Sequence, residues 1–288
     1  MSSAAQAQWS PEPPAELLST TLRRLGEGVG KVVYASEHWV IKRERSPAEV
    51  VAIILLWNAL RKLKRVFPHG WIDRLLQGPS HEIRLLRILV QSAMLFIPKS
   101  LWFTQNIRRT FRTYLSRDVR GERLAQQHLE GSGFVPKSVQ FPPTPVKISG
   151  WPGKLTVSSA TERVEGTLHQ HLSKLAAEGR FGEIEEWLNR LLSLRRSGWS
   201  HGLFSMDAHL KNFGVCGERV VLLDTGGLTN RWSEIMNTLQ FEEQVVEPHR
   251  RLGLREILKA RPDIAARFDQ AWKSVVNPET VREHWPAD

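Results

Sequence analysis

The sequence predicts an α+β fold with a small β-rich amino-terminal lobe and a mainly helical carboxy-terminal lobe. Strand-like runs with turn formers dominate the first part of the chain, and amphipathic helical patterns dominate the last part. Such segregation is typical of α+β proteins. The chain also has 288 residues, of which 41% are hydrophobic, and this is enough to bury the core of a two-lobed globular protein.

A single cysteine, Cys216, excludes a framework of disulfide bonds within the sequence. At the amino terminus, no charged segment followed by an apolar one precedes a cleavage-like site, so we expect no secretory signal. Both observations are typical of proteins in a reducing compartment. The sequence therefore predicts a cytoplasmic protein.

The first elements follow from composition and alternation. Residues 1–16 are rich in Ser, Ala, Gln and Pro and lack apolar periodicity, which predicts a mobile leader. The amino-terminal lobe is expected to span residues 17–166. Its first part alternates β-branched and aromatic residues with turn formers, and GEGVG falls between two strand-like runs. This pattern predicts a hairpin and a third strand that ends at Lys42.

Residues from about 47 to 115 change character, because two segments there combine broad apolar faces with basic flanks. The net charge of the chain is +10, and from Arg43 to Gly121 fifteen Lys and Arg outnumber five Asp and Glu by the same +10. We interpret this basic segment as a helical insertion that favours an anionic surface. No zinc finger or aromatic-rich RNA-binding sheet accompanies it, so we expect no nucleic acid partner.

The apolar runs of the basic segment are too short to cross a membrane. The uncharged run between Arg87 and Lys99 holds eleven residues, whereas a spanning helix needs about 20. Trp57, Trp71 and Trp102 lie among the apolar stretches, and aromatic rings beside basic residues suit the headgroup level of an anionic bilayer. Two alternatives stay open: peripheral docking on the inner face of the membrane, and packing of the apolar faces on the lobe with the charges in water.

The remaining elements follow in the order helix, strands, helices. A helix is predicted from about Val119 to Glu130, and strands are predicted around Ser138, around Lys147 and along KLTVSSATERVEG. The carboxy-terminal lobe is expected to span residues 167–288. Its predicted helices lie in TLHQHLSKL, in EIEEWLNRLLSLRRSG, near residues 233–246 and near residues 264–276.

Three polar residues are spaced for phosphoryl-transfer chemistry. In the run HGLFSMDAHLKNFGVCGERVVLLDTGG, Asp207 lies five residues before Asn212, and Asp224 lies twelve residues after Asn212. Phosphoryl transfer needs one carboxylate near the attacking hydroxyl, and an amide and a second carboxylate that converge on magnesium. A loop from Asp207 to Asn212 and a short hairpin from Phe213 through Val220 would bring the three together.

The same run resembles the protein-kinase-like superfamily. MDAHLKN is similar to its catalytic loop D-x-x-x-x-N, and LLDTGG is similar to its D-F-G element with Thr225 in place of Phe. The resemblance implies a two-lobed protein-kinase-like fold that uses ATP and Mg²⁺. It implies that Asp207 acts on the acceptor hydroxyl and that Asn212 and Asp224 bind the metal ion.

A glycine-rich segment upstream resembles the nucleotide-binding part of that family. Gly26, Gly28 and Gly30 correspond to the loop that covers the phosphates, and Lys42, in the context V-I-K, corresponds to the lysine that contacts them. The segment departs from G-x-G-x-x-G, because Lys31 stands where the third Gly would fall. A plain hairpin turn is the alternative interpretation of these glycines.

The resemblance also implies a carboxylate partner for the lysine and a hinge for adenine. Glu122 is the candidate partner, and Glu130 is the alternative. The run TERVEGTLHQHL resembles the hinge between the lobes, where backbone groups from Arg163 to Glu165 would meet adenine and Gly166 would allow the bend. An ordinary strand-to-helix turn is the alternative interpretation.

Two departures bear on the function. The H-x-D histidine of the family is missing, because Ser205 occupies its position; His201 is an alternative structural histidine, and His209 lies where many small-molecule kinases carry His. No A-P-E element follows Asp224, and about sixty residues remain. This favours resemblance to lipopolysaccharide, sugar and antibiotic kinases, or to the persistence-toxin kinases whose loop also reads D-x-H-x-K-N, over classical protein kinases.

The sequence therefore predicts an atypical kinase that phosphorylates a hydroxyl of a glycan, a lipid-linked sugar or a small molecule. Two alternatives stay open. One is a pseudokinase or nucleotide-binding scaffold at a membrane surface, which the missing histidine favours. The other is an atypical protein kinase.

Overall fold

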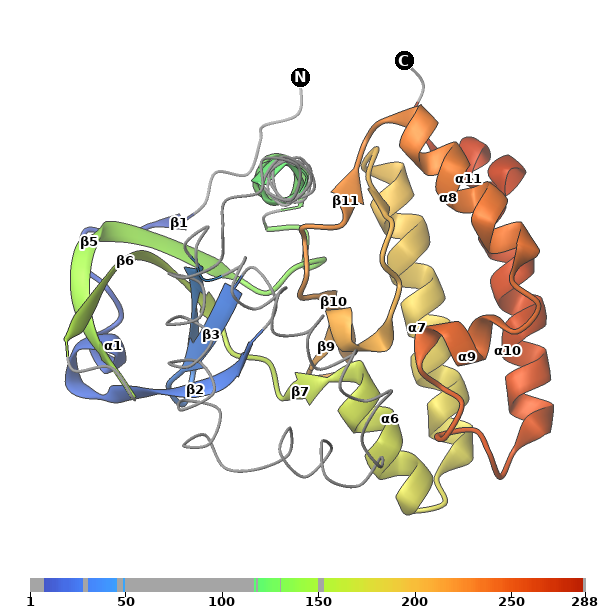
Figure 1. Ribbon diagram of the computed structural model, residues 1–288, viewed down its shortest axis with the longest axis horizontal. Helices are drawn as coiled ribbons and strands as arrows, with labels where there is room; N and C mark the ends of the chain where they lie inside the picture. The colour runs from blue at the N-terminus through green and yellow to red at the C-terminus, as the bar shows by residue number, and fades with distance from the viewer. Residues whose placement is uncertain are drawn as a thin grey trace, which may run out of the picture. The chain divides into compact units, whose positions relative to one another are not determined.

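The computed structural model describes residues 8–27, 31–45, 49, 117, 119–129, 131–149 and 153–286. Gly28, Gly30, Glu130 and nearly all of the basic segment lie outside the described residues. The described part combines a sheet that contains antiparallel pairs with several helices, which confirms the α+β class (Figure 1).

The chain divides into two units. The first comprises Met1–Arg23, Ala35–Ile41 and Ser116–Asp288, and the second comprises Arg24–Tyr34 and Lys42–Leu115. The units divide at other points than residue 166, so the predicted division into lobes at that residue stays a prediction. In the second unit the structure describes strand residues on either side of the glycine-rich segment and the end of the strand that carries Lys42.

A six-stranded sheet has the strand order β1-β5-β2-β3-β4-β6. Its long hairpin pairs β5 and β6 antiparallel, whereas β1 and β2 pair with β5 in parallel. The predicted strands around Ser138 and Lys147 are confirmed as the two halves of β5. The strands are β1 (Gln8–Trp9), β2 (Thr21–Glu27), β3 (Lys31–Ala35), β4 (Trp39–Glu44), β5 (Ser138–Ile148) and β6 (Lys154–Glu162).

Part of the segment predicted to be a mobile leader forms secondary structure. Residues 8–9 form β1, and helix α1 (Ala15–Ser19) precedes the first long strand. Leu17 of α1 is fully buried, and β1 gains its hydrogen bonds from β5, more than 120 residues away in the chain. Both elements depend on distant partners, so the local composition of residues 1–16 did not indicate them.

The carboxy-terminal part is helical, as the apolar periodicity predicted (Figure 1). Along α7 the buried positions Ile184, Trp187, Leu188 and Leu191 recur at helical spacing. A capping box begins α6, where the Thr167 side chain accepts a hydrogen bond from the backbone N–H of Gln170 and the Gln170 side chain accepts one from the N–H of Thr167. The helices are α6 (Leu168–Ala177), α7 (Phe181–Ser200), α8 (Trp232–Gln244), α9 (Pro248–Leu252), α10 (Pro262–Val275) and α11 (Pro278–His284).

The predicted helix after the basic segment covers residues 119–128. Leu124, Ala125 and Leu129 are buried in the same hydrophobic cluster as the apolar faces of α6 and α7. This packing attaches helix 119–128 to the part of the chain that carries Asp207 and Asp224. Within the described residues, no helix has both the length and the apolar character needed to cross a membrane.

Three short ladders and one turn of 3-10 helix frame the candidate site. The predicted hairpin after Asn212 is confirmed as β9 and β10, which β7 extends to a three-stranded sheet. A separate ladder pairs β8 with β11. These elements are β7 (Gly166–Thr167), β8 (Phe204–Ser205), η1 (Leu210–Asn212), β9 (Phe213–Cys216), β10 (Arg219–Leu222) and β11 (Leu228–Thr229).

Candidate functional site

The loop that carries Asp207 is shaped by its own side chains. It begins at the end of β8, where Ser205 Oγ donates a hydrogen bond to the Asp207 carbonyl oxygen at 3.2 Å. Asp207 Oδ1 accepts the N–H of His209 at 3.2 Å, an arrangement that fixes the direction of an aspartate in a turn. The Asp207 side chain is nevertheless exposed. A carboxylate is thus held in one orientation and presented to solvent.

Asn212 connects the two aspartates. Its carbonyl oxygen accepts the N–H groups of Leu223 at 2.8 Å and of Asp224 at 3.3 Å. Its side-chain Nδ2 donates to the Asp207 carbonyl oxygen at 3.5 Å. The structure therefore brings the three sequence-predicted residues into one hydrogen-bonded cluster at the ends of η1 and β10.

Asp224 begins a tight turn that closes against the Asp207 loop. Its Oδ1 accepts the N–H of Gly226 at 3.1 Å, and its side chain is exposed. Beyond the turn, the carbonyl oxygen of Gly227 accepts the N–H of Met206 at 3.0 Å, and β11 then pairs with β8. The segment after Asp224 and the segment before Asp207 are therefore hydrogen-bonded side by side.

The donor set suits a magnesium ion. Because Asn212 Nδ2 donates its hydrogen bond to Asp207, the amide oxygen of Asn212 is the atom left to bind a metal ion. Asp224 likewise keeps a second carboxylate oxygen beside the one that accepts the N–H of Gly226. Mg²⁺ prefers oxygen ligands and usually binds one or two carboxylates together with water and phosphate oxygens. Among the described residues, no group of three or more His, Cys, Asp or Glu side chains gathers as a metal cluster.

Helix 119–128 approaches the turn after Asp224 closely. A Cβ atom on Gly121 would lie 2.2 Å from the Thr225 carbonyl oxygen and 3.0 Å from backbone atoms of Gly226. Only glycine allows this approach without a shift, because real Cβ contacts are longer. Just before the helix, Arg117 Nη2 donates to Met206 Sδ at 3.4 Å. The start of the helix therefore contacts both loops of the candidate site.

An ion pair reinforces the same contact. Arg120 Nη2 and Thr229 Oγ1 both donate to Glu234 Oε2, each at 2.6 Å. Burial acts to raise the pKa of Glu234, but the hydrogen bonds from Thr229 and Arg120 outweigh it and hold the pKa below its ordinary value. The carboxylate therefore stays charged at neutral pH and ties helix 119–128 to β11 and α8.

The predicted lysine and its partner belong to different units. Lys42 is exposed on β4 in the second unit, whereas Glu122 is half-buried on helix 119–128 in the first. Their ion pair stays a prediction. Among the described residues, none has a heavy atom within 4 Å of the place where a Cβ of Gly26, at the end of β2, would lie. Close packing therefore gives no reason for a glycine at this position.

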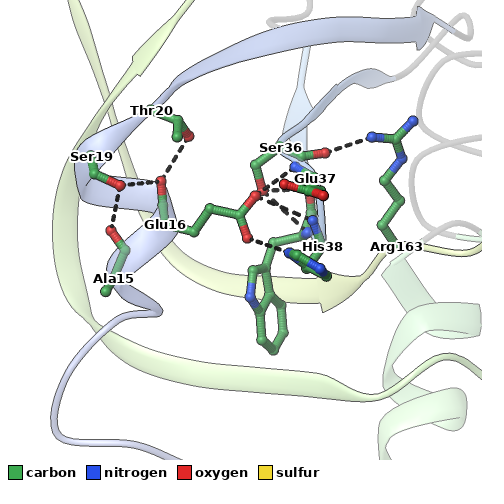
Figure 2. Close-up of polar contacts among 9 residues, drawn as sticks. Ala15, Glu16, Ser19, Thr20, Ser36, Glu37, His38 and Arg163 are labelled. Atoms are coloured by element: carbon green, nitrogen blue, oxygen red, sulfur yellow. Dashed lines mark hydrogen bonds and ion pairs between the residues drawn. The ribbon is translucent and has the colours of Figure 1, made fainter.

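The predicted hinge is already engaged in hydrogen bonds. Arg163 donates its N–H to the His38 carbonyl oxygen at 2.7 Å. Its Nη1 donates to the Ser36 carbonyl oxygen, also at 2.7 Å (Figure 2). Glu165 donates its N–H to the Val215 carbonyl oxygen at 3.0 Å, and its Oε1 accepts the N–H of Gly217 at 2.8 Å. These two N–H groups are therefore not the ones left for adenine. In the described part of the chain, the N–H of Val164 between them has no hydrogen-bond partner.

His201 and His209, the two histidines near Asp207, both contact the protein backbone. His201 is exposed at the carboxyl end of α7, where its Nδ1 lies 2.7 Å from the Ser197 carbonyl oxygen, so it caps the helix and does not hold the Asp207 loop. His209 Nδ1 accepts the N–H of Lys211 at 3.2 Å. Its ring stacks at 6.4 Å from that of His169, whose pKa is lowered by burial and by the neighbouring charges of Lys211 and His209.

Sequence reasoning missed Arg195. This residue follows Leu188, Leu191 and Leu192 on the buried face of α7, and Trp199 continues the same stripe. An arginine in the middle of an apolar stripe was a signal in the sequence, because charged residues are almost never fully buried without a role or a partner. Its contacts with the Asp207 loop are described below.

A comparison of the chain with protein-family models and with curated proteins found no match.

Proposed function

We propose that this protein is a Mg-ATP-dependent phosphotransferase of the protein-kinase-like type, with a hydroxyl group as acceptor. The observation that carries the proposal is the cluster of Asp207, Asn212 and Asp224. Two hydrogen bonds to the Asn212 carbonyl oxygen and one from its side chain join residues from two separate loops. Their types and order are those that phosphoryl transfer needs.

Each residue has a role in this proposal. Asp207 orients the acceptor hydroxyl and takes its proton, because its carboxylate is held by His209 and exposed. Asn212 and Asp224 hold the magnesium ion, which neutralises phosphate charge when bound. From the sequence resemblance we propose further that Lys42 contacts the phosphates, that Glu122 pairs with Lys42, and that Gly26, Gly28 and Gly30 cover the nucleotide.

The adenine contacts are proposed with one change. The N–H groups of Arg163 and Glu165 have partners within the protein, so the backbone N–H of Val164 is the better candidate in the hinge segment. Gly26 supports the nucleotide cradle, because neither close packing against the described residues nor a left-handed backbone explains a glycine there. Glycines in phosphate-binding loops let the backbone approach the ligand.

The proposed acceptor is a glycan, a lipid-linked sugar or a small molecule. Only residues 225–231 separate Asp224 from the start of α8, which leaves little chain for a peptide-docking segment. We place the protein in the cytoplasm, with an anionic membrane surface as a candidate partner of the basic segment. A nucleotide-binding scaffold without turnover is the second candidate, favoured by Ser205 at the position of the missing histidine.

The first test is removal of the Asp224 carboxylate. We expect Asp224→Asn to keep its fold and to lose the thermal stabilisation that Mg-ATP gives the parent, because the metal loses its charged ligand. Glu243→Gln, which removes an exposed carboxylate from α8, is the control and should respond like the parent. Equal stabilisation of Asp224→Asn and the parent would show that the metal assignment is wrong.

Asp207→Asn separates the enzyme from the scaffold. In the parent, radiolabelled ATP should label a member of a panel of glycan, lipid and small-molecule acceptors. Asp207→Asn should bind Mg-ATP normally and lose about 10²- to 10⁴-fold in transfer rate, the usual contribution of a general base. A parent that binds Mg-ATP but labels nothing in the panel and hydrolyses no ATP would favour the scaffold.

A further inference from the structure

Arg195 is a buried arginine in the last turns of α7. Its relative exposure is 4%. One guanidinium nitrogen, Nη2, donates to the Ser205 carbonyl oxygen at 3.2 Å. The guanidinium carbon lies 5.3 Å from the centre of the Phe204 ring and 5.0 Å from that of the Trp272 ring. Aromatic packing and one backbone contact thus hold the side chain.

Among the described residues no carboxylate forms an ion pair with Arg195, although the charges of Glu242 and Asp207 act on it. In the described part of the chain, its Nε and Nη1 have no hydrogen-bond partner, and nearby Glu242 forms its ion pair with Arg251. Burial lowers the pKa of Arg195 to about 10, so the group stays protonated at neutral pH. A buried cation without a paired acid costs stability. Its presence points to a role other than stabilising the core.

The contact of Arg195 lies where the two loops of the site meet. Ser205 pairs with Leu228 in the ladder between β8 and β11, and its hydroxyl donates to the Asp207 carbonyl oxygen. The next residue, Met206, donates its N–H to Gly227. A shift of the Ser205 carbonyl would therefore move the start of the Asp207 loop and the end of the turn that Asp224 begins.

We propose that Arg195 is a positioning residue, whose guanidinium fixes the Ser205 carbonyl and thereby the loop that carries Asp207. The inference rests on the proposed function for its catalytic consequence. Ser205 occupies the position of the H-x-D histidine, which would anchor the Asp207 loop from inside the loop. His201 contacts the Ser197 carbonyl oxygen at the end of α7. Arg195 supplies the anchor from the neighbouring helix, and its positive charge attracts the Asp207 carboxylate.

The chain offers a matched control on the same helix. Arg190 also donates to a backbone carbonyl, that of Glu218 at 3.0 Å, and also lies over an indole ring, that of Trp187 at 4.5 Å. Its contact is with the turn between β9 and β10 and not with the Asp207 loop. Arg190 is more exposed than Arg195, so the two replacements are not expected to cost the same global stability. Denaturant is therefore added until the compared proteins have the same free energy of unfolding.

The first measurement is amide hydrogen exchange in the full chain without nucleotide. The amides followed are those of Met206 and Asn212, which donate to Gly227 and His209. In Arg195→Met we expect them to exchange about tenfold faster, since local opening becomes easier, while amides in α10 keep their rates. Arg195→Lys should give an intermediate rate, because lysine keeps the charge but lacks the planar fork. Arg190→Met should match the parent.

The second measurement is steady-state transfer. Arg195→Met should lower kcat about 10- to 100-fold, as expected for a misplaced catalytic group, while KM for Mg-ATP stays within about twofold of the parent. If loop exchange and kcat in Arg195→Met equal those in Arg190→Met, Arg195 only fills the core and the proposal is wrong. If Arg195→Met does not fold, parent-like exchange and kcat in Arg195→Lys overturn the proposal. A parent without transfer activity would contradict the proposed function, whereas the exchange rates would still test the anchor.

Discussion

Asp207 shows how a single carboxylate can be held and still be available. One oxygen accepts the N–H of His209, and in the described part of the chain the other oxygen has no hydrogen-bond partner. The backbone of the same residue is fixed by Ser205 and Asn212. The side chain therefore has little freedom to lose when an acceptor binds, which is the condition for effective positioning.

Glu16 is a second residue whose carboxylate organises its surroundings. It lies on α1, and its Oε1 accepts the N–H groups of Glu37 and His38 while Oε2 lies 3.1 Å from His38 Nδ1 (Figure 2). Partial burial acts to raise the pKa of Glu16, but hydrogen bonds from Ser36, His38 and the backbone outweigh it and lower the pKa. The charged carboxylate thus joins α1 to the turn that also accepts the Arg163 side chain.

We predict that Glu16→Gln reduces stability at neutral pH by about 1 kcal/mol or more, since hydrogen bonds to charged groups exceed those to neutral ones. A lowered folded-state pKa means that this contribution is present above the unfolded pKa of about 4.3 and disappears as the pH falls through the folded value. Urea denaturation of both proteins from pH 7 to pH 3 measures the difference. A gap that persists unchanged at pH 3 would contradict the assignment to the ionised carboxylate.

At the scale of elements, helix 119–128 and Arg117 just before it contact both loops of the site. The close approach of the helix to the turn after Asp224 depends on Gly121. Because glycine has no side chain, the Thr225 carbonyl oxygen can occupy the space that a Cβ would take. Arg120 adds the ion pair with Glu234. The helix therefore supports the turn that begins at Asp224 from outside the hydrogen-bonded cluster.

We predict that Gly121→Ala lowers the free energy of unfolding by about 1–3 kcal/mol, the usual cost of overpacking, against a gain of up to about 1 kcal/mol in helix propensity. It should also weaken Mg-ATP binding, because the Thr225 backbone must move. Gly182→Ala is the control, since no heavy atom of the described residues lies within 4 Å of the new methyl group on α7, and it should be neutral or slightly stabilising. Urea titration and calorimetric Mg-ATP binding measure both effects, and equal behaviour of the two variants would contradict the prediction.

The sequence predicted those elements whose signals are local. The apolar stripe of α7 and the hairpin of β9 and β10 carry their own periodicity and turn residues, and the spacing of Asp207, Asn212 and Asp224 follows from them. The sequence did not indicate α1 or β1, because their stability comes from contacts with distant strands. It also did not indicate that the N–H of Glu165 is used by Val215, since that pairing joins segments fifty residues apart.

At the scale of the whole molecule, the excess positive charge lies in one stretch of the chain. We predict salt-sensitive binding to anionic vesicles, since each basic residue near acidic lipid contributes roughly 1 kcal/mol. Replacement of Arg61, Lys62, Lys64 and Arg65 by Gln should remove most of it. Replacement of Arg196, Arg255, Lys259 and Lys273, which are all exposed, removes the same charge elsewhere and is the control.

Co-sedimentation with anionic and with neutral vesicles, at low and at high salt, measures the binding. Negligible binding of the parent to both kinds of vesicle would exclude the membrane surface as a partner. Equal loss in the two charge variants would instead assign binding to net charge alone, which falls by the same amount in both.

The parallel pairing of β2 with β5 has a consequence for synthesis of the chain. Thr21 pairs with Lys147, so β2 leaves the ribosome long before its partner is made. At 5–20 residues per second, the wait is roughly ten seconds, and the unpaired edges of β1 and β2 are exposed to other chains during that time. The nascent protein should therefore depend on chaperones until about residue 162, where β6 ends, while the helices of the last third can form from local contacts as they emerge.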